Sequence, residues 1–218
     1  MQKSNATKLN RYPKIFSYLK KNFEDKSKNI LSYGCSDGSE CITIKNYFPN
    51  ANIYGTDIII KDSYDKDNIK YFPVKNFPNI KFDLIMINAV LCNFAEKGHS
   101  GWGWGPNTTT ISNFNTFDKY INLVDKFLNI GGVILMTNAN YLFTDSSVSH
   151  KYKPLEFTEN INDYDKRKDN TTFLVHNYVP IYDRENNRIF PTTKPNERDT
   201  PINVFENFPK HYLFKKLS

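Results

Sequence analysis

One stretch near the N-terminus constrains the fold more than any other part of the chain. Residues 29–33 read as a short strand, 34–38 as a glycine-containing turn, 39–48 as a helix and 53–58 as a second strand. A strand, helix and strand within about 30 residues form a βαβ unit, in which a right-handed crossover joins two parallel strands. This stretch therefore predicts a parallel sheet covered by helices.

The alternation of strands and helices continues along the chain. An N-terminal helix begins near Pro13, a residue that suits a first helical turn. Further segments follow in the order strand, strand, helix and strand, at residues 70–74, 82–90, 114–128 and 133–137. The continuous apolar run of 82–90 is typical of a strand that is buried on both faces. We expect Gly131 and Gly132 to cap the C-terminal side of the 114–128 helix.

The pattern weakens beyond residue 144. Residues 171–182 and 188–190 read as two strands with a turn at 183–187, which predicts an antiparallel hairpin that closes the sheet. We therefore expect an N-terminal helical lead-in, an α/β domain and a C-terminal extension packed on that domain. Their predicted ranges are 1–28, 29–190 and 191–218.

Composition excludes several classes of protein. Of the 218 residues, 39% are hydrophobic and 15% aromatic, which indicates a globular chain. No apolar run approaches the roughly 18 residues of a membrane span, so no membrane partner is expected. The net charge is +6, but only 5 of the 29 basic residues are Arg and the Lys residues are scattered, so nucleic acid is not the expected partner.

The three cysteines predict reduced thiols rather than a disulfide framework or a zinc site. Cys35, Cys41 and Cys92 are odd in number, widely placed and without a C-x-x-C pair. The N-terminus shows no apolar signal segment. We therefore expect a cytoplasmic protein.

The turn after the first strand contains the residues that indicate a ligand-binding site. Gly34 and Gly38 allow a ligand to approach the backbone closely, and the following helix begins with unpaired N–H groups. Asp57 ends the second strand, where an acid can accept two hydrogen bonds from a ribose diol. This spacing predicts a nucleoside-containing cofactor without deciding which one.

The segment Gly34-Cys-Ser-Asp-Gly38-Ser-Glu40, the strand-end acid Asp57 and the strand that opens Phe82-Asp-Leu-Ile together resemble class I S-adenosylmethionine-dependent methyltransferases. The resemblance covers roughly residues 28–143. It implies a Rossmann-like, mostly parallel sheet of seven strands, the last antiparallel, with helices on both faces and S-adenosylmethionine as the cofactor.

The resemblance also assigns the cofactor-binding residues. Asp57 would hold the ribose hydroxyls, Ile58 would flank the adenine, and Asn88 would sit beside the reactive methyl group. The methionine and ribose part would be lined by Gly34, Cys35, Ser36 and Gly38.

The chain departs from the family pattern at two positions. Most members carry an acid where this chain has Ser32, and often a glycine where it has Ser36. Because the acid contacts the ammonium group of the cofactor, Ser32 predicts weaker cofactor binding. We interpret Glu40 as a first-turn acid stabilised by the helix dipole. A nicotinamide dinucleotide is disfavoured, because Ser36 and Ser39 interrupt the G-x-G-x-x-G spacing.

A glycine- and tryptophan-rich segment at residues 97–106 follows the 82–90 strand. It contains Trp102 and Trp104, the two tryptophans of the chain, and we predict that it closes over the acceptor site. The alternative is an ordinary surface loop. His99 lies in this segment and is the candidate general base by position, although no motif surrounds it. No metal is predicted, because the acids at 62, 65 and 67 lack the spacing of a calcium loop.

These observations predict a methyltransferase that acts on a hydroxyl of a small molecule or glycan. Asn88-Ala-Val-Leu replaces the N-P-P-Y-type tetrad of enzymes that methylate amino groups of nucleic acids. Two alternatives stay open: a non-catalytic nucleoside- or partner-binding module on the same fold, and a nucleic-acid methyltransferase, which the charge alone suggests. The oligomeric state and the acceptor atom are not predicted.

Overall fold

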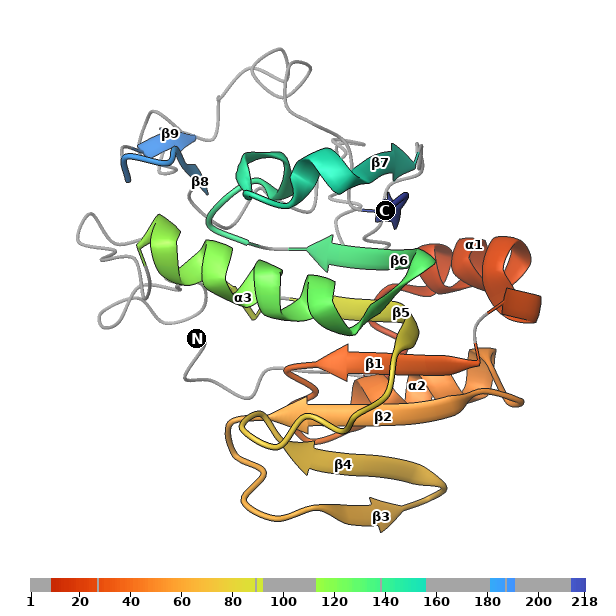
Figure 1. Ribbon diagram of the computed structural model, residues 1–218. Helices are drawn as coiled ribbons and strands as arrows, with labels where there is room; N and C mark the ends of the chain where they lie inside the picture. Colours follow the sequence, from red (N-terminus) through yellow and green to blue (C-terminus); the bar gives the residue numbers. More distant parts are fainter. Residues whose placement is uncertain are drawn as a thin grey trace, which may run out of the picture.

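The computed structural model describes residues 9–26, 28–88, 90–91, 113–137, 139–155, 181–186, 188–190 and 213–218. Its centre is an eight-stranded sheet with the order β3-β4-β2-β1-β5-β6-β10-β7 (Figure 1). The strands are β1 Asn29–Tyr33, β2 Asn52–Asp57, β3 Tyr64–Lys66, β4 Ile69–Pro73, β5 Phe82–Asn88, β6 Leu128–Thr137, β7 Tyr152–Leu155 and β10 Leu213–Lys216. The helices are α1 Pro13–Phe23, α2 Ser39–Tyr47 and α3 Phe114–Phe127, with short 3-10 turns at Glu24–Lys26, Phe143–Asp145 and Ser149–Lys151.

The predicted α/β class is confirmed. Strands β4, β2, β1, β5 and β6 pair in parallel, and β10 lies antiparallel between β6 and β7. The expected number of seven strands is wrong by one, because β3 adds an antiparallel edge strand beside β4. All three residues of β3 are exposed. A polar strand without a buried face shows no alternation of apolar and polar residues by which the sequence could reveal it.

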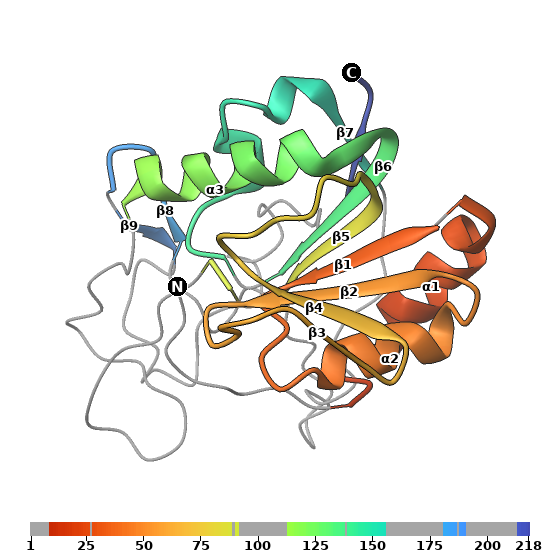
Figure 2. The ribbon, with the colours of Figure 1, turned by 60° about the horizontal axis from the view of Figure 1, so that its bottom comes forward.

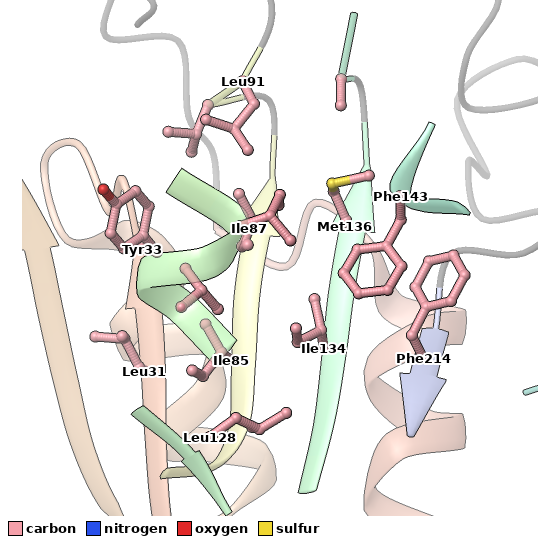
Figure 3. Close-up of a cluster of buried hydrophobic side chains, with 14 of the residues drawn as sticks. Leu31, Tyr33, Ile85, Ile87, Leu91, Leu128, Ile134, Met136, Phe143 and Phe214 are labelled. Carbon is pink, nitrogen blue, oxygen red and sulfur yellow. The ribbon is translucent and has the colours of Figure 1, made fainter. Parts of the chain in front are cut away.

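Helices cover both faces of the sheet (Figure 2). On one face, α1 and α2 pack against a core that includes Ile30, Leu84 and Leu135. On the other face, α3 packs against a core that includes Leu31, Ile85 and Ile134 (Figure 3). Neighbouring residues of one strand enter opposite cores because side chains alternate across a sheet. Both faces of the parallel strands are thus buried, as the continuous apolar runs predicted.

The predicted hairpin exists but does not close the main sheet. Strand β8, Ile181–Tyr182, pairs with β9, Arg188–Phe190, in a separate two-stranded sheet. The antiparallel place in the main sheet is taken by β10, from the segment for which we predicted packing on the domain. Residues 156–180 lie outside the described part of the chain.

The predicted glycine cap of α3 is also wrong. Leu128 already has extended backbone angles, so α3 runs directly into β6. Gly131 and Gly132 lie inside β6, where the pairing register with β5 shifts and Gly131 has a φ of +81°. Their backbone freedom serves an irregularity in the strand rather than the end of a helix.

None of the described helices has the length and apolar character needed to cross a membrane.

Candidate active site at the carboxyl ends of the parallel strands

The turn that follows β1 is held by backbone hydrogen bonds at the carboxyl edge of the sheet. The amides of Gly34 and Cys35 donate to the carbonyl oxygen of Thr56 at 2.7 and 3.1 Å, which ties the turn to the end of β2. Positive φ angles occur at Gly34, Ser36 and Gly38, with values of +80°, +53° and +89°. Two glycines thus occupy positions at which other residues would be strained.

Close packing gives both glycines a second role. A Cβ atom at Gly34 would lie 2.3 Å from Val90 Cγ2, and one at Gly38 would lie 2.6 Å from the Tyr71 hydroxyl. Real Cβ atoms do not approach other atoms so closely, so larger residues would displace Val90 or Tyr71. The turn therefore fits tightly between the chain after β5 and the side chain from β4.

Asp57 lies at the end of β2, as the sequence predicted. Its carboxylate oxygens accept hydrogen bonds from the backbone amides of Ser36 at 2.9 Å and Ile59 at 3.2 Å. A carboxylate has about four acceptor positions, so acceptor capacity remains for further donors such as a pair of hydroxyls. Asp57 is half-buried and the next residue, Ile58, is 44% exposed, so an apolar surface lies beside the carboxylate.

A second carboxylate enters the same edge from α2. Ser32 Oγ on β1 donates to Glu40 Oε1 at 2.7 Å, and Asn88 Nδ2 on β5 donates to Glu40 Oε2 at 2.6 Å. Asn88 is in turn oriented by Thr137 Oγ1 on β6, which donates to Asn88 Oδ1 at 3.0 Å. Three neighbouring strands and one helix therefore position a single carboxylate.

The electrostatic state of Glu40 is unusual for a first-turn acid. Burial raises the pKa of the Glu40 carboxyl above its usual value, while hydrogen bonds from Ser32 and Asn88 and the positive charge of Arg11 oppose that rise. Burial disfavours the charged form because it removes water, and a cation placed beside the carboxylate would favour that form. The arrangement is therefore suited to receive a positively charged ligand group.

The sequence interpretation of Glu40 was incomplete. The residue does lie in the first turn of α2, as predicted, but its carboxylate reaches inward to Ser32 instead of only facing the helix dipole. Ser32, at the position where the family that the sequence resembles usually carries an acid, is thus hydrogen-bonded to an acid eight positions later. The sequence does show a strand Ser followed by a helical Glu. Whether the two side chains meet depends, however, on where α2 lies relative to β1, which the sequence pattern does not give.

Of the residues predicted to line the cofactor, two place their side chains away from solvent. Cys35 is 1% exposed and lies in the core on the α1 and α2 face, where Cys41 and burial raise the pKa of its thiol. A thiol that stays protonated is a poor nucleophile, so the surroundings of the Cys35 side chain are those of a packing residue. Ser36 Oγ is buried and has no hydrogen-bond partner within the described residues.

The remaining predicted residues lie in a part of the chain that is not described. His99, Trp102 and Trp104 all belong to residues 92–112, which are outside the described ranges. Across the described ranges, no group of three or more His, Cys, Asp or Glu side chains could hold a metal ion.

Comparisons with known proteins show partial structural similarity to methyltransferases. The plantazolicin methyltransferase BpumL, in complex with a desmethylPZN analog and SAH, is 19% identical with a TM-score of 0.36, over 59% of this chain and 48% of that one. A putative O-methyltransferase from Nostoc punctiforme is 13% identical with a TM-score of 0.39, over 60% and 37% of the two chains.

A putative caffeoyl-CoA O-methyltransferase from Staphylococcus aureus is 11% identical with a TM-score of 0.39, over 61% and 59% of the two chains. This chain thus aligns with less than two thirds of each of these three structures. No family model matches the sequence, and no curated protein matches it.

Proposed function

We propose that this chain binds S-adenosylmethionine and transfers its methyl group to an acceptor. The observation that carries the proposal is the pair of carboxylates at one edge of the sheet, Asp57 at the end of β2 and Glu40 against the ends of β1 and β5. A nucleoside with an amino-acid head needs an acceptor for its ribose hydroxyls and another for its ammonium group. The two carboxylates supply these from positions fixed by neighbouring strands.

The residues at this edge fit the cofactor. The Glu40 carboxylate is partly desolvated and lies near Ser32, the position where the related family usually carries the acid. Glu40 would thus replace that acid from the neighbouring helix and bind the ammonium group, so that Ser32 need not weaken binding. Asp57 would hold the ribose, and Ile58 would flank the base. The turn formed by Gly34, Cys35, Ser36 and Gly38 would line the methionine and ribose part of the cofactor.

The bound cofactor supplies a methyl group that is already activated on a sulfonium. The protein therefore mainly has to align the acceptor with that methyl group and exclude water, which lowers the barrier through proximity and orientation. Asn88, held between Thr137 and Glu40, has one amide N–H engaged with Glu40 and a second that can face the ligand. This orientation supports the proposed role of Asn88 beside the reactive methyl group.

We further propose that the acceptor is a hydroxyl of a small molecule or glycan, and that the protein is cytoplasmic. Asn88-Ala-Val-Leu supports this class, because it differs from the tetrad used for amino-group methylation. Trp102 and Trp104 are proposed to close over that acceptor, with His99 as the candidate base. The acceptor itself is to be found by screening candidate hydroxyl compounds for SAH formation.

The test compares S-adenosylhomocysteine with 5′-methylthioadenosine, which has the same nucleoside but no amino-acid head. In Glu40→Gln, the Asn88 amide can still donate to the new carbonyl, and the Ser32 hydroxyl can accept from the new amide. Calorimetry should show about tenfold to hundredfold weaker binding of S-adenosylhomocysteine, the range for a hydrogen bond to a charged group. Binding of 5′-methylthioadenosine should be unchanged.

Asp57→Ala serves as the control because it removes the proposed ribose contact, so it should weaken both ligands. If the unmodified chain binds neither ligand at millimolar concentration, the proposed function is wrong. If Glu40→Gln weakens both ligands equally, the nucleoside site stands and the role of Glu40 is wrong. Binding without any methyl transfer to a broad acceptor panel would favour a non-catalytic nucleoside-binding module.

A further inference from the structure

Tyr33 is a buried tyrosine whose hydroxyl group has no partner within the described part of the chain. It is the last residue of β1, and its side chain is 1% exposed. Its oxygen makes no hydrogen bond to any residue in the described ranges, and burial raises the pKa of the hydroxyl, with Tyr120 and Asp57 adding to the rise. A buried hydroxyl without a partner is costly, and phenylalanine would fill the same space without that cost.

The surroundings of Tyr33 are aromatic and apolar. Its ring lies 6.0 Å from the ring of Phe77 and 6.5 Å from that of Tyr120, which meets it edge-on. Val90 and Leu91, which follow β5, belong to the same core. Figure 3 shows the Tyr33 oxygen directed toward the end of the sheet at which Leu91 lies. The hydroxyl therefore faces the edge that carries the proposed cofactor site.

Ser32 and Tyr33 divide this edge into two parts. They are consecutive residues of β1, so their side chains point to opposite faces of the sheet. Ser32 lies with Glu40 on the α2 side, which is polar and charged, and Tyr33 lies on the α3 side, which is aromatic. Tyr33 pairs with Thr56 on the neighbouring strand β2, and Asp57 is the residue after Thr56.

We propose that the Tyr33 hydroxyl forms a hydrogen bond with the purine base of the bound nucleoside and thus contributes to base recognition. This inference rests on the proposed function. If Glu40 holds the amino-acid head and Asp57 the ribose, the base extends away from Glu40, toward the α3 side. A flat apolar base suits aromatic neighbours, and its ring nitrogens and amino group offer partners for one buried hydroxyl.

The test is Tyr33→Phe, which removes the oxygen and keeps the ring. Calorimetry should show S-adenosylhomocysteine and 5′-methylthioadenosine weakened by the same factor, about threefold to tenfold, the range for a neutral hydrogen bond. The melting temperature of the ligand-free variant should equal or exceed that of the unmodified chain, because the variant lacks the unpartnered hydroxyl. Tyr54→Phe is the matched control, because Tyr54 lies in the same core within β2, and it should leave both affinities unchanged.

The outcomes separate this inference from the proposed function. If the unmodified chain binds both ligands and Tyr33→Phe binds them equally well, Tyr33 is a packing residue and the inference is wrong. A loss confined to S-adenosylhomocysteine would also overturn it, because the missing contact would then belong to the amino-acid head. If the unmodified chain binds neither ligand, the proposed function fails and this inference fails with it.

Discussion

Two carboxylates that are partly or fully removed from solvent, Glu40 and Asp125, have pKa values shifted in opposite directions. Glu40, at the carboxyl edge of the sheet, is held by the neutral groups of Ser32 and Asn88, and burial raises its pKa. Asp125, in α3, is 5% exposed. It accepts hydrogen bonds from Lys151 Nζ at 2.8 Å and Tyr152 Oη at 2.9 Å, and it lies 2.9 Å from Lys216 Nζ.

The net effect on Asp125 is the reverse of that on Glu40. Burial acts to raise the pKa of Asp125, but the hydrogen bonds from Lys151, Lys216 and Tyr152 outweigh it and hold the pKa below its usual value. Asp125 has two ammonium partners within the fold, whereas Glu40 accepts hydrogen bonds from the neutral groups of Ser32 and Asn88, and the positive charge of Arg11 does not outweigh the effect of its burial. The comparison indicates that Asp125 stabilises the fold, whereas Glu40 has the surroundings expected of the ligand-binding group that we propose.

The Asp125 cluster also explains how the C-terminal strand is fixed. Lys216, in β10, donates to the carbonyl oxygens of Asp125 and Leu128 at 2.8 and 3.3 Å. Tyr152 and Lys151 bring the start of β7 and the turn before it to the same carboxylate. One charged cluster thus joins α3, β6, β7 and β10.

The largest expected effect is on stability, from Asp125→Asn. Removing one partner of a buried ion pair leaves the others uncompensated and costs about 3–5 kcal/mol. Chemical denaturation should show this loss of unfolding free energy, while the folded fraction should bind S-adenosylhomocysteine normally. The control is Asp65→Asn on the exposed strand β3, where we expect a change below about 0.5 kcal/mol. A loss of ligand affinity equal to that in Glu40→Gln would show that the two carboxylates are not separate in function.

The second expected effect is a pH dependence that distinguishes the two carboxylates. Because the pKa of Glu40 is raised, its ionised form becomes available only as pH rises through that pKa, and the affinity for a ligand ammonium group should rise with it. The limit is about tenfold per pH unit below the pKa. Calorimetry from about pH 5 to about pH 8 should show this slope in the unmodified chain and a flat profile in Glu40→Gln.

In the ligand-free chain, Asp125 and Glu40 should change the free energy of unfolding in opposite directions as pH rises. The pKa of Asp125 is lowered, so its contribution is present above its unfolded pKa and is lost as pH falls toward the folded value. The pKa of Glu40 is raised, so its protonated form favours folding at low pH, and that contribution is lost as pH rises through the folded pKa. Chemical denaturation across the acid range should show that Asp125→Asn lacks the loss of stability at low pH, and that Glu40→Gln lacks the loss of stability as pH rises. Equal pH profiles in both variants would contradict the assignment.

The smallest expected effect tests whether a carboxylate on strand β1 could bind the ammonium group of the ligand in place of Glu40. Ser32→Asp combined with Glu40→Gln returns an acid to the strand position while removing the helical one. We expect this double variant to bind S-adenosylhomocysteine about threefold to tenfold more tightly than Glu40→Gln alone, because an acid on the shorter Asp side chain restores only part of the charge-assisted hydrogen bond. Ser32→Asp alone should lower the melting temperature, since two carboxylates would then lie in contact. A double variant no better than Glu40→Gln would mean that only α2 can position the acid.

The sequence by itself determined the parallel core of the sheet and the first residues of the site. The runs predicted at 29–33, 53–58 and 82–90 correspond to the strands β1, β2 and β5, whose central residues are buried on both faces, and a helix follows the first run. Gly34, Gly38 and Asp57 were predictable because a tight turn and a strand end constrain residue type through local geometry alone. Their proposed ligand roles stay predictions.

Only the tertiary structure decided which distant residues meet. β10 joins the sheet through four residues, too few to show a period, and its place depends on Lys216 reaching Asp125, 91 positions earlier. Glu40 reads as an ordinary helical acid until α2 brings it to Ser32 and Asn88. Local patterns report the backbone and the burial of single segments. The protonation state of a carboxylate depends instead on its neighbours in space, and those are set by packing.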